Sequence, residues 1–159
     1  MKIIGGKLKG STLYITKDKT TRPLKNIARE SIFNLLIHSK KISFKFEEAV
    51  ILDLYSGTGS FGLECLSRQV KKVFFVEKDN YAIKILEKNI DKLKLKNKSE
   101  IYFNDVYQVI GKQNVFNYKF DLIFCDPPFK DLDLKKLIQL IADKKAKGPV
   151  RKKYFKRKN

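Results

Sequence analysis

The sequence predicts an α/β protein with a mostly parallel sheet, because short apolar stretches alternate with segments whose apolar residues recur at helical spacing. Five of the six residues from Ala49 to Leu54 are apolar, which is typical of a strand buried on both faces. A glycine-rich turn follows this strand directly. Three further strands are predicted at Val73–Val76, Glu100–Phe103 and Phe120–Cys125.

Length and charge limit the class of protein. With 159 residues, 43% of them hydrophobic, the chain has about the length of one domain and can bury a core. The formal net charge of +18 favours RNA or DNA as partner before an anionic membrane surface, although a solvated lysine-rich surface has the same composition. No apolar run approaches the roughly 20 residues of a membrane span, and the first residues lack a signal peptide. We predict a cytoplasmic monomer without a membrane partner.

The cysteines and the single histidine do not predict a metal site. Cys65 and Cys125 have no close cysteine or histidine partner in the sequence, so we expect two buried thiols in a reduced compartment and no metal. His38 falls at a predicted helix end, where a capping or surface role is expected rather than catalysis.

The chain begins with a predicted hairpin from Lys2 to Ile15, in which glycines separate two apolar segments. Lys2, Lys7 and Lys9 are predicted to grip RNA phosphates from this hairpin, although a small solvated edge would have the same pattern. Residues 1–22, the hairpin and a polar link, form the first predicted unit.

A helix is predicted from Pro23, which suits a first helical turn, to about Ile37. Arg22, just before it, and Arg29, within it, are predicted RNA-binding residues. The expected apolar stripe of this helix is Ala28, Ile32, Leu35 and Leu36.

The glycine-rich turn predicts a cofactor site. Gly57 and Gly59 allow positive φ and leave no Cβ between backbone and ligand, while Gly62 lets the next helix pack close to the strand. Such a turn alone is weak evidence for a cofactor site, since glycine pairs occur in many loops. Asp53 would repel a pyrophosphate, so the turn favours a ligand without phosphates there. S-adenosylmethionine is such a ligand, because it carries an ammonium and a sulfonium group.

Two more acids follow the second and third predicted strands. Glu77 lies about 20 residues past the turn, where an acid takes the ribose hydroxyls of an adenosine ligand. A helix-capping role is the weaker interpretation, because Asn80 already supplies a cap. Asp105 could lie beside the adenine amino group, although a turn formed with Asn104 explains it almost as well. The intervening helix is expected to bury Ala82, Leu86, Ile90 and Leu93.

The fourth predicted strand is followed directly by Asp126, Pro127, Pro128 and Phe129. Two prolines cannot continue a ladder, so the chain must leave the sheet here and hold the Asp126 side chain outward. The acid and the adjacent aromatic favour a functional site over a simple proline stop. A helix is then expected to pack back on the sheet through Leu134, Leu137, Ile138 and Ile141.

Together these motifs resemble class I S-adenosylmethionine-dependent methyltransferases, and Asp-Pro-Pro-Phe narrows the resemblance to enzymes that methylate an exocyclic base amine. The stretches IIGGKLKG, TRPLKNIARESIFNLL and LDLYSGTGSFGLECLSRQ look like the RsmD family, which methylates N2 of a guanine in small-subunit (16S) ribosomal RNA. The resemblance runs from Ile3 to about Ile141. It implies a Rossmann-like three-layer sandwich with residues 23–141 as the methyltransferase domain, S-adenosylmethionine as cofactor, and ribosomal RNA or an assembling small subunit as partner.

The resemblance also implies roles for residues. Asp126 and the Pro127 carbonyl would accept hydrogen bonds from the guanine amine, next to Pro128, and Phe129 would stack on the flipped base. Alignment of the reacting groups, rather than a metal or strong acid-base chemistry, would supply most of the acceleration. The implied cofactor-binding residues are Asp53, Tyr55, Gly57, Gly59, Glu77, Lys78, Asp105, Val106 and Asp126.

The carboxyl end departs from the family pattern. Family members continue through further strands, whereas residues 142–159 hold nine basic residues, one acidic residue and no strand-length apolar run. We therefore expect that the C-terminal strands are truncated. Residues 142–159 would then be either an aberrant end or a basic RNA-binding tail, and the sequence does not decide between the two. The predicted strand order is third, second, first, fourth. Phe120–Cys125 would then be an exposed edge, since three basic residues argue against a strand within 149–155.

Three other functions share some of these features. A DNA adenine amino-methyltransferase would share the Asp-Pro-Pro-Phe motif. A dinucleotide-dependent oxidoreductase would share the glycine turn and Glu77, but hydride transfer requires neither Asp53 nor that motif. A catalytically impaired RNA-binding protein would need only the basic surface. The sequence favours an rRNA (guanine-N2-)-methyltransferase over these three.

Overall fold

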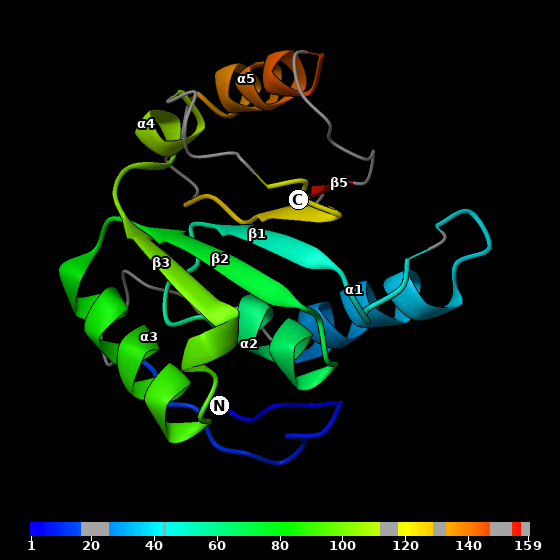
Figure 1. The fold of residues 1–159 in the computed structure, drawn as a ribbon, viewed down its shortest axis with the longest axis vertical. Helices are drawn as coiled ribbons and strands as arrows, with labels where there is room; N and C mark the ends of the chain where they lie inside the picture. The colour runs from blue at the N-terminus through cyan, green and yellow to red at the C-terminus, as the bar shows by residue number, and fades with distance from the viewer. Residues whose placement is uncertain (17–25, 43, 112–117, 129–132, 147–153, 157–159) are drawn as a thin grey trace.

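The apolar stretches of the chain pair as a parallel sheet of five strands in the order β3-β2-β1-β4-β5 (Figure 1). This computed structural model describes residues 1–16, 26–42, 44–111, 118–128, 133–146 and 154–156. The strands are β1 (Val50–Leu54), β2 (Lys72–Glu77), β3 (Ser99–Phe103), β4 (Leu122–Cys125) and β5 (Tyr154–Lys156).

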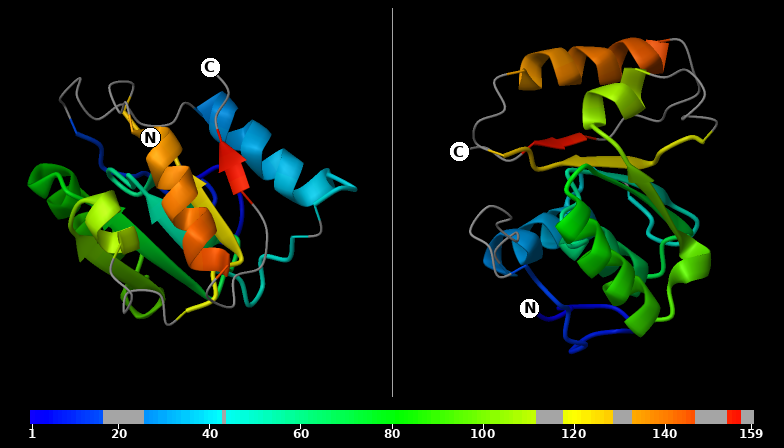
Figure 2. Two further views of the ribbon diagram at one scale, coloured as in Figure 1. Left: turned by 90° about the horizontal axis from the view of Figure 1, so that it is seen from above. Right: turned by 90° about the vertical axis from the view of Figure 1, so that its left-hand side faces the viewer.

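Helices cover both faces of the sheet, which confirms the predicted three-layer sandwich (Figure 2). The helices α1, α2 and α3 lie on one face, and α4 and α5 on the other. Their bounds are α1 (Asn26–His38), α2 (Ser60–Ser67), α3 (Asn80–Lys92), α4 (Val106–Gly111) and α5 (Leu134–Ala146), with a 3-10 turn at Lys96–Lys98. None of the helices in the described ranges has the length and apolar character of a membrane span.

Alternate residues of the central strands fill the two halves of the core, as expected where both faces are covered. On β1, Ile51 packs with the α1–α3 side, whereas Leu52 and Leu54 pack with the α4–α5 side. On β2, Phe75 and Phe74 divide in the same way. The strand positions and the order of the first four strands were therefore predictable from the sequence.

The prediction that the fourth strand is an unpaired edge is wrong. β5 pairs in parallel with β4, from Ile123 opposite Tyr154 to Cys125 opposite Lys156. The basic residues that argued against a strand precede the paired segment, and a three-residue strand at the edge of a sheet tolerates charge that a central strand would not. Because α5 also runs to Ala146, parts of the segment assigned to a basic tail belong to the sandwich.

The predicted apolar stripe of α1 is also partly wrong. Leu36 is buried, but Leu35 is 51% exposed. The helix packs instead through Phe33, whose ring stacks on Phe61 of α2 with centroids 5.2 Å apart. Arg29, on the same face, is 0% exposed. Pro23 lies outside the described residues.

The N-terminal hairpin is confirmed, although its two arms are only lightly paired. Lys2 and Thr12 form an isolated antiparallel bridge, and the Ile3 N–H donates to the Ser11 carbonyl at 2.9 Å. Ile3 and Leu13 are each 2% exposed and belong to the core on the α1–α3 side. The hairpin therefore lies outside the sandwich on that side (Figure 2) and depends on contacts with the helices beneath it.

Two of the three expectations for cysteine and histidine hold. Cys65 is a buried free thiol, and His38 is the last residue of α1. Cys125, expected to be buried, is only partly so. No group of three or more His, Cys, Asp or Glu side chains able to hold a metal occurs in the part of the chain that the structure describes.

Candidate active site at the carboxyl ends of the strands

The strand order reverses at β1, which lies between β2 and β4. In open α/β sheets, ligands bind beyond the carboxyl ends of the strands at such a point. Asp53 of β1 is level with Phe75 of β2 and Phe124 of β4, so Glu77 and Asp126 follow two residues later on either side. The topology therefore brings three predicted site residues together at the carboxyl ends of the strands.

Asp53 is 1% exposed, and its Oδ2 accepts a hydrogen bond from the Gly62 N–H at 3.0 Å. The pKa of this carboxyl is raised to about 8, mainly by burial and also by the charges of Asp126 and Glu77, while the Gly62 hydrogen bond lowers it. Ionisation of Asp53 is thus opposed by repulsion from both Glu77 and Asp126. A cationic ligand at these strand ends would relieve that repulsion.

Asp53 should make the protein less stable as the pH rises. Because its folded-state pKa of about 8 lies above the ordinary value of 3.8, the folded protein holds this proton more tightly than the unfolded chain does. Its contribution to the unfolding free energy should fall between about pH 4 and 8, by up to about 5 kcal/mol. Asp53→Asn keeps an acceptor for the Gly62 N–H but cannot ionise, so its unfolding free energy should not show this fall with pH. Urea unfolding of both proteins from pH 5 to 9 measures it, and parallel pH profiles would contradict the assignment.

The turn after β1 has the backbone that its glycines predicted. Gly57 has φ 53° and Gly59 has φ 86°, the region that favours glycine, and Tyr55 also has a positive φ of 56°. A Cβ on Gly59 would meet the Leu86 side chain of α3. A Cβ on Gly62 would press into the Phe75 ring, so the expectation of close helix–strand packing at this glycine is confirmed.

Glu77 ties the end of β2 to this turn. Its Oε2 accepts from the Gly57 N–H at 2.8 Å, and its Oε1 accepts from Lys78 and Asp79 N–H groups at 2.8 and 2.9 Å. The N-cap of α3 is Asp79, whose side chain accepts from Ala82 N–H, and not Asn80 as predicted. Glu77 is thus held at the site by backbone donors and does not cap the helix itself.

Asp105 takes part in a turn at the start of α4. Its N–H donates to the Asn104 side chain at 2.8 Å, and its Oδ1 accepts from the Tyr107 N–H at 2.9 Å. Its Oδ2 lies 3.1 Å from the Lys78 Nζ. Val106 is 3% exposed and packs in the α4–α5 half of the core. The turn interpretation of Asp105 is therefore present in the structure, and its adenine role stays a prediction.

The Asp-Pro-Pro segment leaves the sheet directly after β4. Asp126 and Pro127 are half-buried and Pro128 is exposed. The charge of Asp126 contributes to the raised pKa of Asp53. Phe129, the predicted stacking residue, lies outside the described residues.

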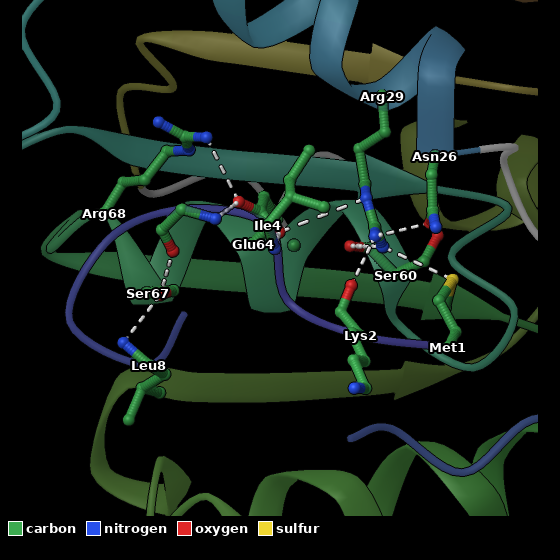
Figure 3. Close-up of polar contacts among 12 residues, drawn as sticks. Met1, Lys2, Ile4, Leu8, Asn26, Arg29, Ser60, Glu64, Ser67 and Arg68 are labelled. Carbon is green, nitrogen blue, oxygen red and sulfur yellow. Dashed lines mark hydrogen bonds and ion pairs between the residues drawn. The ribbon is translucent and has the colours of Figure 1, made fainter. Parts of the chain in front are cut away.

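The predicted RNA-binding residues divide into three groups. Lys2, Lys7 and Lys9 are exposed on the hairpin, as phosphate contacts require, and Arg22 lies outside the described residues. The prediction for Arg29 is wrong, because this side chain is 0% exposed and points into the protein (Figure 3). Its guanidinium lies 4.0 Å from Glu64 and donates to backbone carbonyls, so it has no surface to offer a phosphate.

Three polar residues that the sequence did not single out hold the hairpin in place. Glu64 of α2 is 0% exposed and accepts from the Ile4 and Gly5 N–H groups at 2.9 and 2.8 Å (Figure 3). Ser67 and Asn89, both 0% exposed, also bind hairpin backbone. The only available signal was their place among apolar neighbours, as in SFGLECLS, where a polar residue at a core position needs a partner.

Comparison with known proteins agrees with this geometry. The family described as "Conserved hypothetical protein 95" matches residues 1–157. Ribosomal RNA small subunit methyltransferase D of Buchnera aphidicola is 36% identical over 89% of this chain and 67% of its own, and that of Haemophilus influenzae is 32% identical over 90% and 71%. The solved structure of the Escherichia coli protein yhhF, a candidate methyltransferase, is 26% identical and aligns with a TM-score of 0.76 over 91% of this chain and 72% of its own.

Proposed function

The chain belongs to the RsmD family, and from this premise we propose that it transfers a methyl group from S-adenosylmethionine to N2 of a guanine in small-subunit ribosomal RNA. The observation that carries the proposal is that Asp53, Glu77 and Asp126 lie at the carboxyl ends of three neighbouring strands, at the point where the strand order reverses. A ligand with two cationic groups fits a site of this charge.

The residues around the turn fit the proposed cofactor. We propose that Gly57 presents backbone without a Cβ to the cofactor and that a cationic ligand would favour the ionised form of Asp53. We propose that Glu77, which accepts from three backbone N–H groups, also accepts from the ribose hydroxyls. We propose that Tyr55, Lys78, Asp105 and Val106 complete this site. The bound cofactor would supply a methyl group activated by its sulfonium.

The protein's own part in the reaction is to align the amine. We propose that the Asp126 carboxylate and the Pro127 carbonyl accept hydrogen bonds from the two N–H bonds of the guanine amine, which aims the nitrogen lone pair at the methyl group. The two prolines hold this arrangement outside the sheet. We further propose that Phe129 stacks on the flipped base. A cytoplasmic monomer acting on rRNA or an assembling small subunit completes the proposal.

Calorimetric titration tests the cofactor directly. S-adenosylmethionine should bind with a one-to-one stoichiometry, and Glu77→Ala should weaken it, because the variant loses both the ribose acceptor and the anchor of Gly57. Glu87→Ala, an exposed acid of α3, is the control and should bind normally. Binding of NADH without binding of S-adenosylmethionine would instead support an oxidoreductase.

The hairpin lysines should contribute to RNA binding without affecting the cofactor. If Lys2, Lys7 and Lys9 each contact one phosphate, changing all three to alanine should reduce the log-log salt slope of RNA binding by about three, or about one per residue. Filter binding of small-subunit rRNA between 50 and 300 mM salt measures the slope, with Lys135 and Lys136 on α5 as control substitutions. An unchanged slope would assign the hairpin a purely structural role.

A further inference from the structure

Two buried side chains each contact both the N-terminal hairpin and the glycine turn. From α1, the Arg29 guanidinium donates to the Lys2 carbonyl at 2.5 Å and to the Ser60 carbonyl at 3.4 Å (Figure 3). From α3, the Asn89 side chain accepts from the Tyr14 N–H at 2.7 Å and donates to the Tyr14 carbonyl at 3.0 Å. Its amide also donates to a carbonyl of the turn, that of Thr58, at 3.1 Å.

The ends of these bridges are arranged in a regular way. On the hairpin, Lys2 lies on the first arm and Tyr14 on the second, so each arm has its own bridge. At the other end of the bridges, Thr58 of the turn and Ser60, the first residue of α2, flank Gly59, the N-cap residue with φ 86°. The turn is therefore tied on both sides of its glycine to both arms of the hairpin.

The bridges resist independent movement of the two parts. Arg29 and Asn89 are both 0% exposed, so water cannot replace a carbonyl that moves away from them, and a buried donor left without its acceptor is costly. The arms of the hairpin are joined by a few backbone hydrogen bonds and form no continuous ladder, so the hairpin also depends on these contacts to keep its position. A shift of the turn carbonyls should thus be passed on to the hairpin backbone.

We propose that Arg29 and Asn89 are positioning residues that couple the hairpin to the glycine turn, so that RNA on the hairpin and cofactor on the turn strengthen each other's binding. This inference rests on the proposed function, which assigns RNA and cofactor to these two parts. By linkage, the factor by which RNA raises cofactor affinity equals the factor by which cofactor raises RNA affinity.

The structure supplies a matched control. Ser67, also buried, accepts from the Leu8 N–H at 3.0 Å and donates to the Gly5 carbonyl at 2.5 Å, and both of these partners lie in the hairpin. Ser67→Ala should loosen the hairpin locally and leave the link to the glycine turn intact. Asn89→Ala removes the link itself.

The first test uses the unmodified protein and amide hydrogen exchange with S-adenosylhomocysteine as probe. Slower hydrogen exchange at the Gly57 and Gly62 amides should report binding of the probe at the turn. Exchange at the Tyr14 amide should then also slow, by about 5-fold or more. The Leu8 amide, held by Ser67, should change little. Protection at the turn without protection at Tyr14 would overturn the coupling and leave the proposed function standing. No protection at the turn at saturating probe would overturn both.

The second test measures the coupling factor by titrating S-adenosylhomocysteine with and without transcribed small-subunit rRNA. The unmodified protein and Ser67→Ala should both show an RNA-dependent gain of about 5-fold or more. In Asn89→Ala the gain should fall towards one, and Arg29→Lys, which keeps the charge but has no guanidinium to span two carbonyls, should also reduce it. An undiminished gain in Asn89→Ala would overturn the proposal. If Asn89→Ala does not fold, the exchange experiment and the RNA-dependent gain measured in Arg29→Lys decide whether the coupling exists.

Discussion

Replacing Asp126 with alanine should slow methyl transfer by a factor on the order of 10² to 10³, because the guanine amine loses the acceptor that orients it. Asp126 follows β4 directly, and its charge contributes to the raised pKa of the buried Asp53. Transfer of tritium from labelled S-adenosylmethionine to small-subunit RNA under single-turnover conditions measures the rate.

Asp121 provides the control for this experiment. It lies at the opposite end of the same strand, where its Oδ2 accepts from the Val50 N–H at 2.9 Å. Asp121→Ala should lower stability by about 1 kcal/mol through this lost hydrogen bond and leave the rate of transfer nearly unchanged. If Asp126→Ala keeps more than about a tenth of the activity, or if both variants slow equally, Asp126 does not orient the amine.

Replacing Glu64 with alanine should lower the unfolding free energy by about 3 to 5 kcal/mol. The change leaves the Arg29 charge buried without its counter-charge, and it removes the acceptor of two hairpin N–H groups. Arg68, whose guanidinium lies 3.2 Å from Glu64, also loses its partner. Urea unfolding monitored by circular dichroism measures the difference.

Glu48 is the matched control, since it forms an ion pair with Lys71 in which the side chains are 84% and 62% exposed. Such surface pairs contribute little, so Glu48→Ala should change the unfolding free energy by less than about 1 kcal/mol. A loss of that small size in Glu64→Ala would show that Glu64 does not hold the hairpin. The two variants together separate a buried charge network from an ordinary surface pair.

The parts of the fold that follow from local rules could be predicted from the sequence. The apolar stretches gave the first four strands and their order, because parallel strands with helical crossovers allow few arrangements. The positive φ values at Gly57 and Gly59 and the close packing at Gly62 also followed from residue type and position. These features follow from residue type and from the order of the elements along the chain.

The parts that were missed depend on contacts between distant segments. Arg29 had the charge of an RNA-binding residue, but Glu64, 35 positions later, draws it into the core. Asn89 has the residue type of the exposed face of α3, but its side chain is buried by partners that lie far away in the sequence, Tyr14 and Thr58. The basic residues before β5 argue against a strand, but three residues at the edge of the sheet are enough to pair with β4, and the sequence does not show this.

Identification of the methylated nucleoside tests the central claim most directly. Small ribosomal particles and rRNA from a strain lacking this protein would be incubated with the purified protein and labelled S-adenosylmethionine, digested, and analysed by mass spectrometry. The proposal predicts N2-methylguanosine at a single position of the small-subunit RNA, and none with Asp126→Ala. Methylation of adenine in DNA alone, or RNA binding with no methyl transfer to either substrate, would contradict it.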